Sequence, residues 1–219
     1  MNARVCSFLM FGLQTAEKVA ECVMHGLVNR AIERFVRDTY GREVWLGIMA
    51  KLDLGCSEFE AMLVYEPDVT AQVLHAVSGT LHRSVDEVSE DIGTYLVSHP
   101  NTAAVRRLLR FSGETFEDFL HSLDDLPDRA RLAVSDLTVP GLELADQSAD
   151  VYCLHVYNPD GVPVRFGPVI LGLLRAMADD YGALVLLDYL DRTQTCERLR
   201  IHLLASAHGE GRAFVLGAS

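Results

Sequence analysis

The sequence predicts an α+β fold: a helical N-terminal lobe over about residues 24–111, followed by a smaller lobe of helices and an antiparallel sheet over about residues 112–205. Three observations support this prediction. Apolar residues recur at helical spacing through the first lobe. β-Prone runs occur only after Pro140-Gly141, and two of them are joined by a short polar loop, as in an antiparallel pair. Residues 1–23 are expected to be an extension or a mis-assigned translation start, and residues 206–219 a flexible tail.

The first lobe contains a series of helices, each bounded by a start or stop signal. The apolar pattern predicts helices over 27–36, 45–52 and 69–77, and Gly41 ends the first of them. Ser84 and Glu87 form a capping-box signature for a helix that reaches about residue 97. After the break at residues 99–101, helices are expected over 102–111 and 114–126.

The second lobe carries the strands. The run VYCLHVY at 151–157 predicts a strand, and the turn NPDG follows it. A helix over 169–177 is expected to end before Gly182. Two further strands are expected over 183–190 and 198–205, and AFVL at 213–216 is a candidate for a short additional strand.

Composition excludes several classes of function. No apolar run approaches the ~20 residues that a membrane span needs. The formal net charge of −12 argues against nucleic acid or an anionic membrane as a partner. The five cysteines show no CxxC spacing, which argues against structural zinc and a disulfide framework and favours the cytoplasm. No catalytic or nucleotide-binding motif occurs, so we expect no enzymatic activity and no metal site.

Several segments, taken in order, resemble one known family. They are MHGLVNRAIERFVRDTYGREVWLGI at 24–48, ETFEDFLHSLDDL at 114–126, Val139-Pro140, CLHVYN at 153–158 and VILGLLRAMADDYG at 169–182. Together they resemble the H-NOX (heme nitric oxide/oxygen-binding) domain, which is related to the β-subunit heme domain of soluble guanylate cyclase. The resemblance covers about residues 24–205. It implies the H-NOX fold and a sensory role in nitric oxide signalling, bacterial in style.

The resemblance also identifies where the family holds heme, and this chain departs from the family there. An ungapped alignment places Pro127 at the position of the axial histidine, and proline has no ligand atom. The family's Y-x-S-x-R motif binds the heme propionates, but its three positions hold Val156, Asn158 and Asp160 here. An aspartate in place of the arginine would repel a propionate rather than bind it. We therefore expect no heme cofactor, and heme binding remains the alternative.

Two residues are weaker substitutes for the missing groups. His121 lies six residues before Pro127, which on a continuous helix places it about 120° away from the expected face. Arg165 could approach the propionate position if the alignment gap in the longer NPDGVPVR loop shifts. The family positions that line the heme cavity carry apolar residues, which also suit ordinary core packing: Val28, Pro140, Val169 and Leu173.

The leading hypothesis is a stand-alone regulatory domain with a degenerate heme site. It would act through a signalling protein such as a histidine kinase or a nucleotide cyclase, or sense a small apolar ligand. The competing hypothesis is a true heme-binding nitric oxide sensor that uses an axial ligand such as His121. Residues 114–128 carry six acids and no base, which favours a solvated helix face over a partner-docking face.

Overall fold

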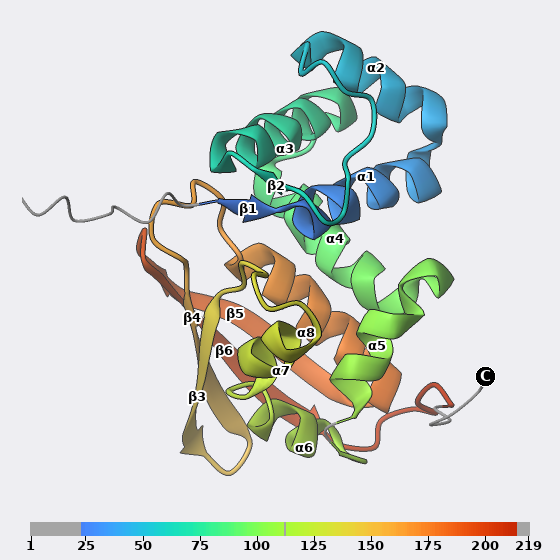
Figure 1. Cartoon of the computed structure of the whole chain (residues 1–219). Helices are drawn as coiled ribbons and strands as arrows, with labels where there is room; N and C mark the ends of the chain where they lie inside the picture. Colours follow the sequence, from blue (N-terminus) through green and yellow to red (C-terminus); the bar gives the residue numbers. More distant parts are fainter. Residues whose placement is uncertain (1–22, 112, 214–219) are drawn as a thin grey trace, which may run out of the picture.

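The computed structural model describes residues 23–111 and 113–213. The helical lobe lies at the top of Figure 1 and the sheet-containing lobe below it. This arrangement confirms the predicted α+β class. The expected N-terminal extension, apart from Val23, and most of the candidate strand at 213–216 lie outside the described residues.

The helical lobe follows the predicted order closely. It consists of α1 (Gly26–Tyr40), α2 (Arg42–Leu52), α3 (Pro67–Leu81), α4 (Val85–Ser98), the 3₁₀ turn η1 (Pro100–Thr102) and α5 (Ala103–Arg110). Two short strands that the sequence did not predict, β1 (Met24–His25) and β2 (Val64–Tyr65), pair antiparallel beside α1. The capping box predicted at Ser84 is present, because its hydroxyl accepts from the amide of Glu87 and the Glu87 carboxylate accepts from the amide of Ser84.

The single helix expected over 114–126 is wrong. The chain forms α6 (Phe116–His121), then a turn, then α7 (Leu126–Ala133). Pro127 lies in the first turn of α7, where a backbone N–H would have no hydrogen-bond partner within the helix. The absence of an N–H on proline therefore costs no helical hydrogen bond. The proline therefore opens a helix instead of interrupting one, and the 120° offset estimated for His121 on a continuous helix no longer applies.

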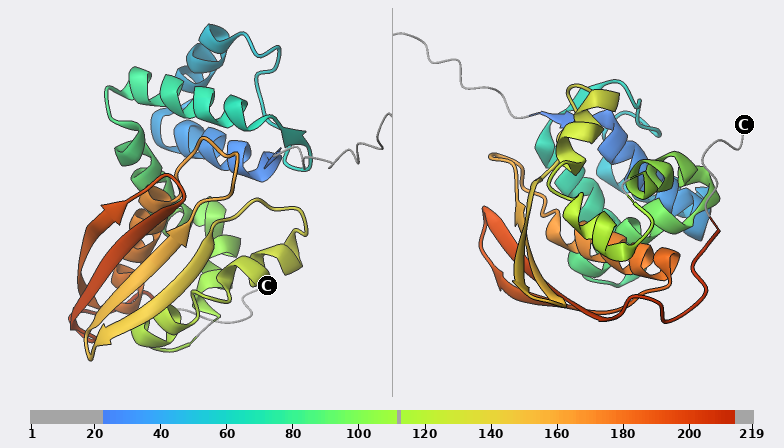
Figure 2. Two further views of the ribbon diagram at one scale, coloured as in Figure 1. Left: turned by 90° about the vertical axis from the view of Figure 1, so that its left-hand side faces the viewer. Right: turned by 90° about the horizontal axis from the view of Figure 1, so that it is seen from below.

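The second lobe contains a four-stranded antiparallel sheet in the order β3-β4-β6-β5. Its strands are β3 (Gly141–Ser148), β4 (Val151–Tyr157), β5 (Leu184–Arg192) and β6 (Cys196–Ala205). Helix α8 (Gly167–Tyr181) and the other helices of this lobe lie on one face of the sheet, as both views in Figure 2 show. Along β6 the residues of the helix-facing side are all buried: Glu197, Leu199, Ile201 and Leu203.

Helices α4 and α8 join the two lobes through a close crossing. A Cβ placed on Gly93 would overlap the carbonyl oxygen of Val169, and a Cβ placed on Gly172 would overlap that of Glu90. Glycine at these positions lets the two backbones approach without an intervening side chain. The crossing therefore fixes how the helical lobe sits on α8.

Part of the expected flexible tail lies within the described residues. The amides of His208 and Gly209 donate to the carbonyl of Gly182, and the amide of Arg212 donates to that of Asp180. These bonds hold residues 208–212 against the end of α8. Among the described helices, none combines the length and the apolar character that a membrane crossing requires.

Candidate functional site

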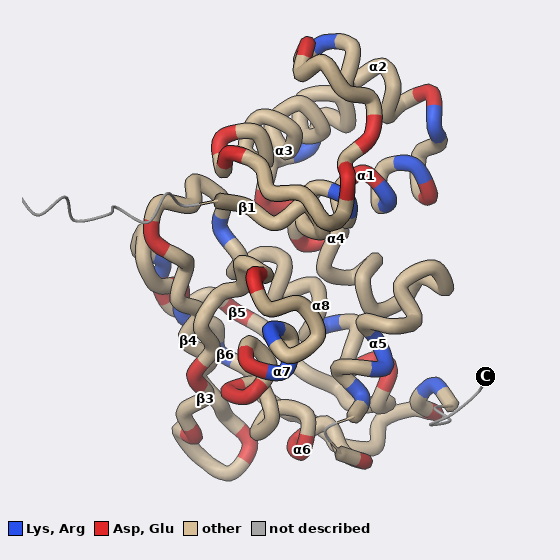
Figure 3. The backbone as a smooth tube through the Cα atoms, in the orientation of Figure 1, with Lys and Arg blue, Asp and Glu red and all other residues tan. Residues whose placement is uncertain are grey.

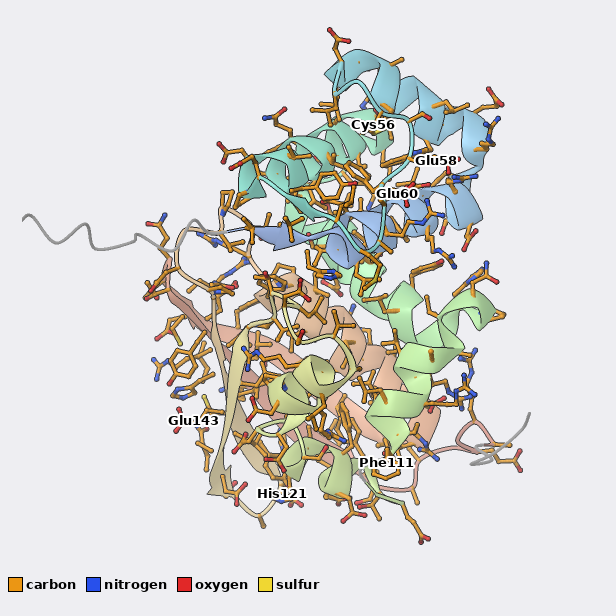
Figure 4. All side chains as sticks on the ribbon, in the orientation of Figure 1. Cys56, Glu58, Glu60, Phe111, His121 and Glu143 are labelled. Atoms are coloured by element: carbon orange, nitrogen blue, oxygen red, sulfur yellow. The ribbon has the colours of Figure 1, made fainter. Side chains whose placement is uncertain are left out.

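A cavity of about 670 Å³ lies between the two lobes. Its walls come from α1, α3, α4, α5 and α8, from the segment 58–61 and from the segment 137–140 that precedes β3. In Figure 4 the segment that carries Glu58 and Glu60 runs beside α1. The volume falls in the ~300–1,000 Å³ range of sites that take small molecules or cofactors.

The inner lining is apolar, and its few polar groups are mostly engaged. Thr70 donates to the side chain of Asn29 at 2.7 Å, and Thr102 donates to the carbonyl of His99 at 2.7 Å. The Tyr95 hydroxyl donates to Asp38 at 2.6 Å. A molecule held inside would therefore find apolar contacts and few hydrogen-bond partners.

A buried carboxylate holds one wall in place. Glu33 on α1 is fully buried and accepts from Arg30 at 2.9 Å and from Arg37 at 2.7 Å. Its other oxygen accepts from the backbone amide of Phe59 at 2.9 Å. Because the bond from Phe59 crosses from the segment 58–61 to α1, it fixes the loop that closes this side of the cavity. The sequence pattern gave no indication of this role for Glu33.

Of the four apolar residues expected to line the family's cavity, three do so: Val28, Pro140 and Val169. Leu173 does not contribute to the lining. It is 6% exposed and packs in the core of the second lobe.

Pro127 is buried in the first turn of α7, but it is not among the residues that line the cavity. Its assignment to the axial-ligand position rests on the alignment alone and stays a prediction. The two weaker substitutes do not reach the cavity either. His121 is exposed and packs edge-on against the ring of Tyr152 at 5.8 Å between centroids, and Arg165 is exposed.

The positions aligned with the propionate motif serve other purposes. Val156 is fully buried in the core beneath the sheet, and Asp160 is exposed. Asn158 is 9% exposed; its side-chain oxygen accepts from the amide of Phe166 at 3.0 Å, and its amide nitrogen donates to Glu197 at 3.2 Å.

Glu197 extends this network from the sheet to α4. Its carboxylate is fully buried and also accepts from the amide of Gly167, at the start of α8, at 3.0 Å. Arg192 donates to Glu197 at 3.2 Å and pairs with Asp86 on α4 at 2.9 Å. Asn158, one of the positions aligned with the propionate motif, thus belongs to a buried polar network, which is defined by Asn158, Glu197, Arg192 and Asp86. We call it the Glu197 network.

The comparisons with known proteins agree with this architecture. The family described as Haem-NO-binding matches residues 25–186. The chain belongs to the Haem-NO-binding, or H-NOX, family. Among curated relatives, the chain is 27% identical over 161 residues to soluble guanylate cyclase gcy-35 of Caenorhabditis elegans, a match that covers 71% of this chain and 22% of that protein. It is 21% identical over 127 residues to soluble guanylate cyclase 89Db of Drosophila melanogaster, covering 58% of this chain and 19% of that protein. The chain thus spans about a fifth of the length of these relatives.

Solved structures show the same fold. An H-NOX protein from S. oneidensis in the Fe(II) ligation state superposes with a TM-score of 0.71 at 17% identity, covering 87% of this chain and all of that one. A variant of the T. tengcongensis H-NOX superposes with a TM-score of 0.67 at 17% identity, covering 84% of this chain and 99% of that one. The predicted H-NOX fold is confirmed.

The family binds heme, but the side chains of this cavity do not fit heme iron. Protein ligands to heme iron are histidine, cysteine, methionine or tyrosine. Of the described residues that line the cavity, none is a histidine, cysteine or methionine. The tyrosine, Tyr95, donates its proton to Asp38, and burial together with that hydrogen bond raises the pKa of its phenol, which disfavours the phenolate that iron would bind. Within the described residues, no cluster of histidine, cysteine and acidic side chains could hold a metal ion either.

Proposed function

We propose that this chain is a sensory or regulatory H-NOX domain whose cavity does not ligate heme and that acts through a protein partner. The observation that carries the proposal is a cavity of about 670 Å³ in which the lining residues that the structure describes offer iron no imidazole and no thiolate. The Glu197 network supports it as well, because the residues at the propionate positions are either buried in that network and the core or exposed.

The partner is proposed from the relatives. The curated matches are named soluble guanylate cyclases, and the matched region is a small part of each. We infer a nucleotide cyclase, or a histidine kinase, as the protein that reads the state of this domain, and the cytoplasm as its location. The domain itself would then be non-catalytic.

Several acids of the stretch 114–128 bond to other groups of the domain, so they are less available for docking a partner. Asp118 caps α6, Asp124 accepts from the amide of Leu144 at 2.7 Å, and Asp128 pairs with Arg131 at 3.0 Å. These acids therefore have structural roles within the domain, which supports the solvated-face interpretation.

The proposal is tested by the absorption spectrum of the purified protein after reconstitution with hemin. We expect no sharp Soret band that nitric oxide shifts. The substitution Pro127→His should create such a band if Pro127 stands at the ligand position. The matched control is Leu132→His, which adds an imidazole to the same helix at a side chain that is 88% exposed and should leave the spectrum unchanged.

A wild-type protein that shows a Soret band shifted by nitric oxide would contradict the proposal. In that case, loss of the band in His121→Ala would assign the iron ligand to His121.

A further inference from the structure

The charged residues of the cavity lie at its rim. The lining contains Arg30 and Arg34 on α1 and Glu58 and Glu60 on the facing segment. Arg30 is already engaged, since it bonds Glu33 at 2.9 Å and lies 3.8 Å from Glu58. Figure 3 shows this mixture of positive and negative positions along α1 and the neighbouring segment.

Arg34 differs from Arg30. It lies four residues later on α1, hence on the same helix face, and it is exposed at the rim. Within the described part of the chain its guanidinium makes no hydrogen bond and no ion pair. The nearby acid, Asp38, accepts from Tyr95 at 2.6 Å and from Asn101 at 2.9 Å. Neither of these hydrogen bonds involves Arg34. The N–H groups of its guanidinium are therefore available to a ligand.

Burial alone would raise the pKa of Asp38, but the bonds from Tyr95 and Asn101 and the nearby positive charges, Arg34 among them, lower it. Asp38 is therefore a carboxylate at neutral pH. Among the described residues of the rim, the guanidinium of Arg34 thus lies near a negative group that is already hydrogen-bonded. An incoming anion would approach from the side of Arg34 and Asn101, both exposed members of the lining.

The interior fits an apolar body. One polar residue of the interior is Ser89, which is 2% exposed. Its hydroxyl makes no hydrogen bond within the described residues. The inner wall includes the aliphatic residues Val28, Ala31, Ile92, Val105, Val164 and Ile170. An apolar interior of this kind favours apolar ligands.

We propose that the cavity binds an amphipathic anion, with an apolar body between the lobes and a single carboxylate-like head group on Arg34. This inference rests on the proposed function, because it requires a cavity that heme iron does not occupy. The planar fork of arginine matches a carboxylate in two parallel hydrogen bonds. Burial of the ligand's apolar body supplies the affinity, and Arg34 favours a ligand with a charged head group over one with a neutral head group.

The test uses displacement of the neutral fluorescent probe N-phenyl-1-naphthylamine from the full chain. Dodecanoate and 1-dodecanol carry the same apolar body with and without charge. We expect dodecanoate to displace the probe at about tenfold lower concentration than dodecanol, as one charge-assisted hydrogen-bonded contact predicts. Decanoate should bind about tenfold or more weakly than dodecanoate, because each methylene buried changes affinity about fourfold.

Arg34→Gln should bring dodecanoate to within about twofold of dodecanol and leave dodecanol unchanged. Arg42→Gln is the matched control, since Arg42 is an exposed arginine at the start of α2 that does not line the cavity. Ala104→Trp places a large side chain at an exposed position of the rim and should weaken both ligands. Thermal melting confirms that each variant is folded.

Equal displacement by the two ligands in the wild type, or a preference that survives Arg34→Gln, would overturn the inference. The same samples are titrated with hemin, so that the two proposals fail separately. A nitric-oxide-sensitive Soret band overturns the proposed function, whereas no such band together with no dodecanoate preference overturns only the ligand class. Hemin that displaces the probe without such a band supports the inference, because hemin is itself an apolar anion.

Discussion

At the scale of single residues, Asn158 has a clear structural role at a position where the sequence alignment predicts a departure from the family pattern. The sequence alignment predicts that Asn158 occupies a position of the family's propionate motif, and in the structure it bonds the backbone of Phe166 and the carboxylate of Glu197. Glu197 in turn joins β6 to the first turn of α8 and, through Arg192, to Asp86 on α4. Asn158 and Glu197 can lie in the protein interior because their hydrogen bonds are satisfied.

Glu197→Ala is predicted to lower the free energy of unfolding by about 3 kcal/mol, because it removes the buried acceptor of three donors and leaves Arg192 with one fewer partner. Urea denaturation measures the change. The control is Glu143→Ala on β3 of the same sheet: Glu143 is exposed and accepts one bond from Tyr157 at 2.8 Å, so its loss should cost less than about 1 kcal/mol. Equal costs for the two variants would show that the Glu197 network does not stabilise the fold.

The sequence contains a signal for the burial of Glu197 in the alternating pattern of its strand. Along CERLRIHLLA the positions of Glu197, Leu199 and Ile201 alternate onto one face, so a strand assignment places this acid among buried leucines. A buried acid in an apolar register predicts a partner network. Which partners complete it could not be predicted, because Asn158, Arg192 and Asp86 come together only through tertiary packing.

At the scale of elements, the long amphipathic helices were predictable and the short or exposed elements were not. Helices α1 and α4 carry both an apolar stripe and terminal signals, and the sequence located both of them. Strand β3 was missed because GLELADQS is an edge strand with mostly exposed positions, which leaves a weak apolar pattern. The boundary between α6 and α7 was not predicted, because the apolar pattern over 114–126 suggested one helix that ends before Pro127, although proline is favoured in the first turn of a helix.

The α4–α8 crossing leads to a prediction at this scale. Gly93→Ala is expected to lower the free energy of unfolding by about 2–4 kcal/mol, since the added methyl group overlaps the backbone of α8. Gly79→Ala on α3 is the matched control, because a Cβ there meets no atom within 4 Å. That variant should be neutral or stabilising by up to about 1 kcal/mol, as alanine favours a helix interior over glycine. Chemical denaturation of both variants distinguishes a packing cost from a general intolerance of substitution.

At the scale of the whole molecule, the cavity and the crossing make the two lobes one unit. The cavity takes its walls from both lobes, and the core of the helical lobe includes Val164 from the segment before α8. The position of the helical lobe on α8 therefore sets the shape of the cavity. A ligand between the lobes would stabilise the arrangement in which both walls contact it, and this is how a bound molecule could be reported to a partner.

This coupling predicts that the lobes unfold together. Trp45, the single tryptophan of the chain, is fully buried in the helical lobe and donates to the carbonyl of Ser57 at 2.8 Å, so its fluorescence reports that lobe alone. Far-UV circular dichroism reports both lobes. We expect the two thermal transitions to coincide within about 2 °C, as two-state unfolding of one cooperative unit requires. A fluorescence transition that precedes the circular dichroism transition would show that the helical lobe unfolds independently.

The Gly93→Ala variant provides a second measurement of the same coupling. Because this substitution weakens the contact between the lobes, it should separate the two transitions that coincide in the wild type. Gly79→Ala should leave the two transitions coincident.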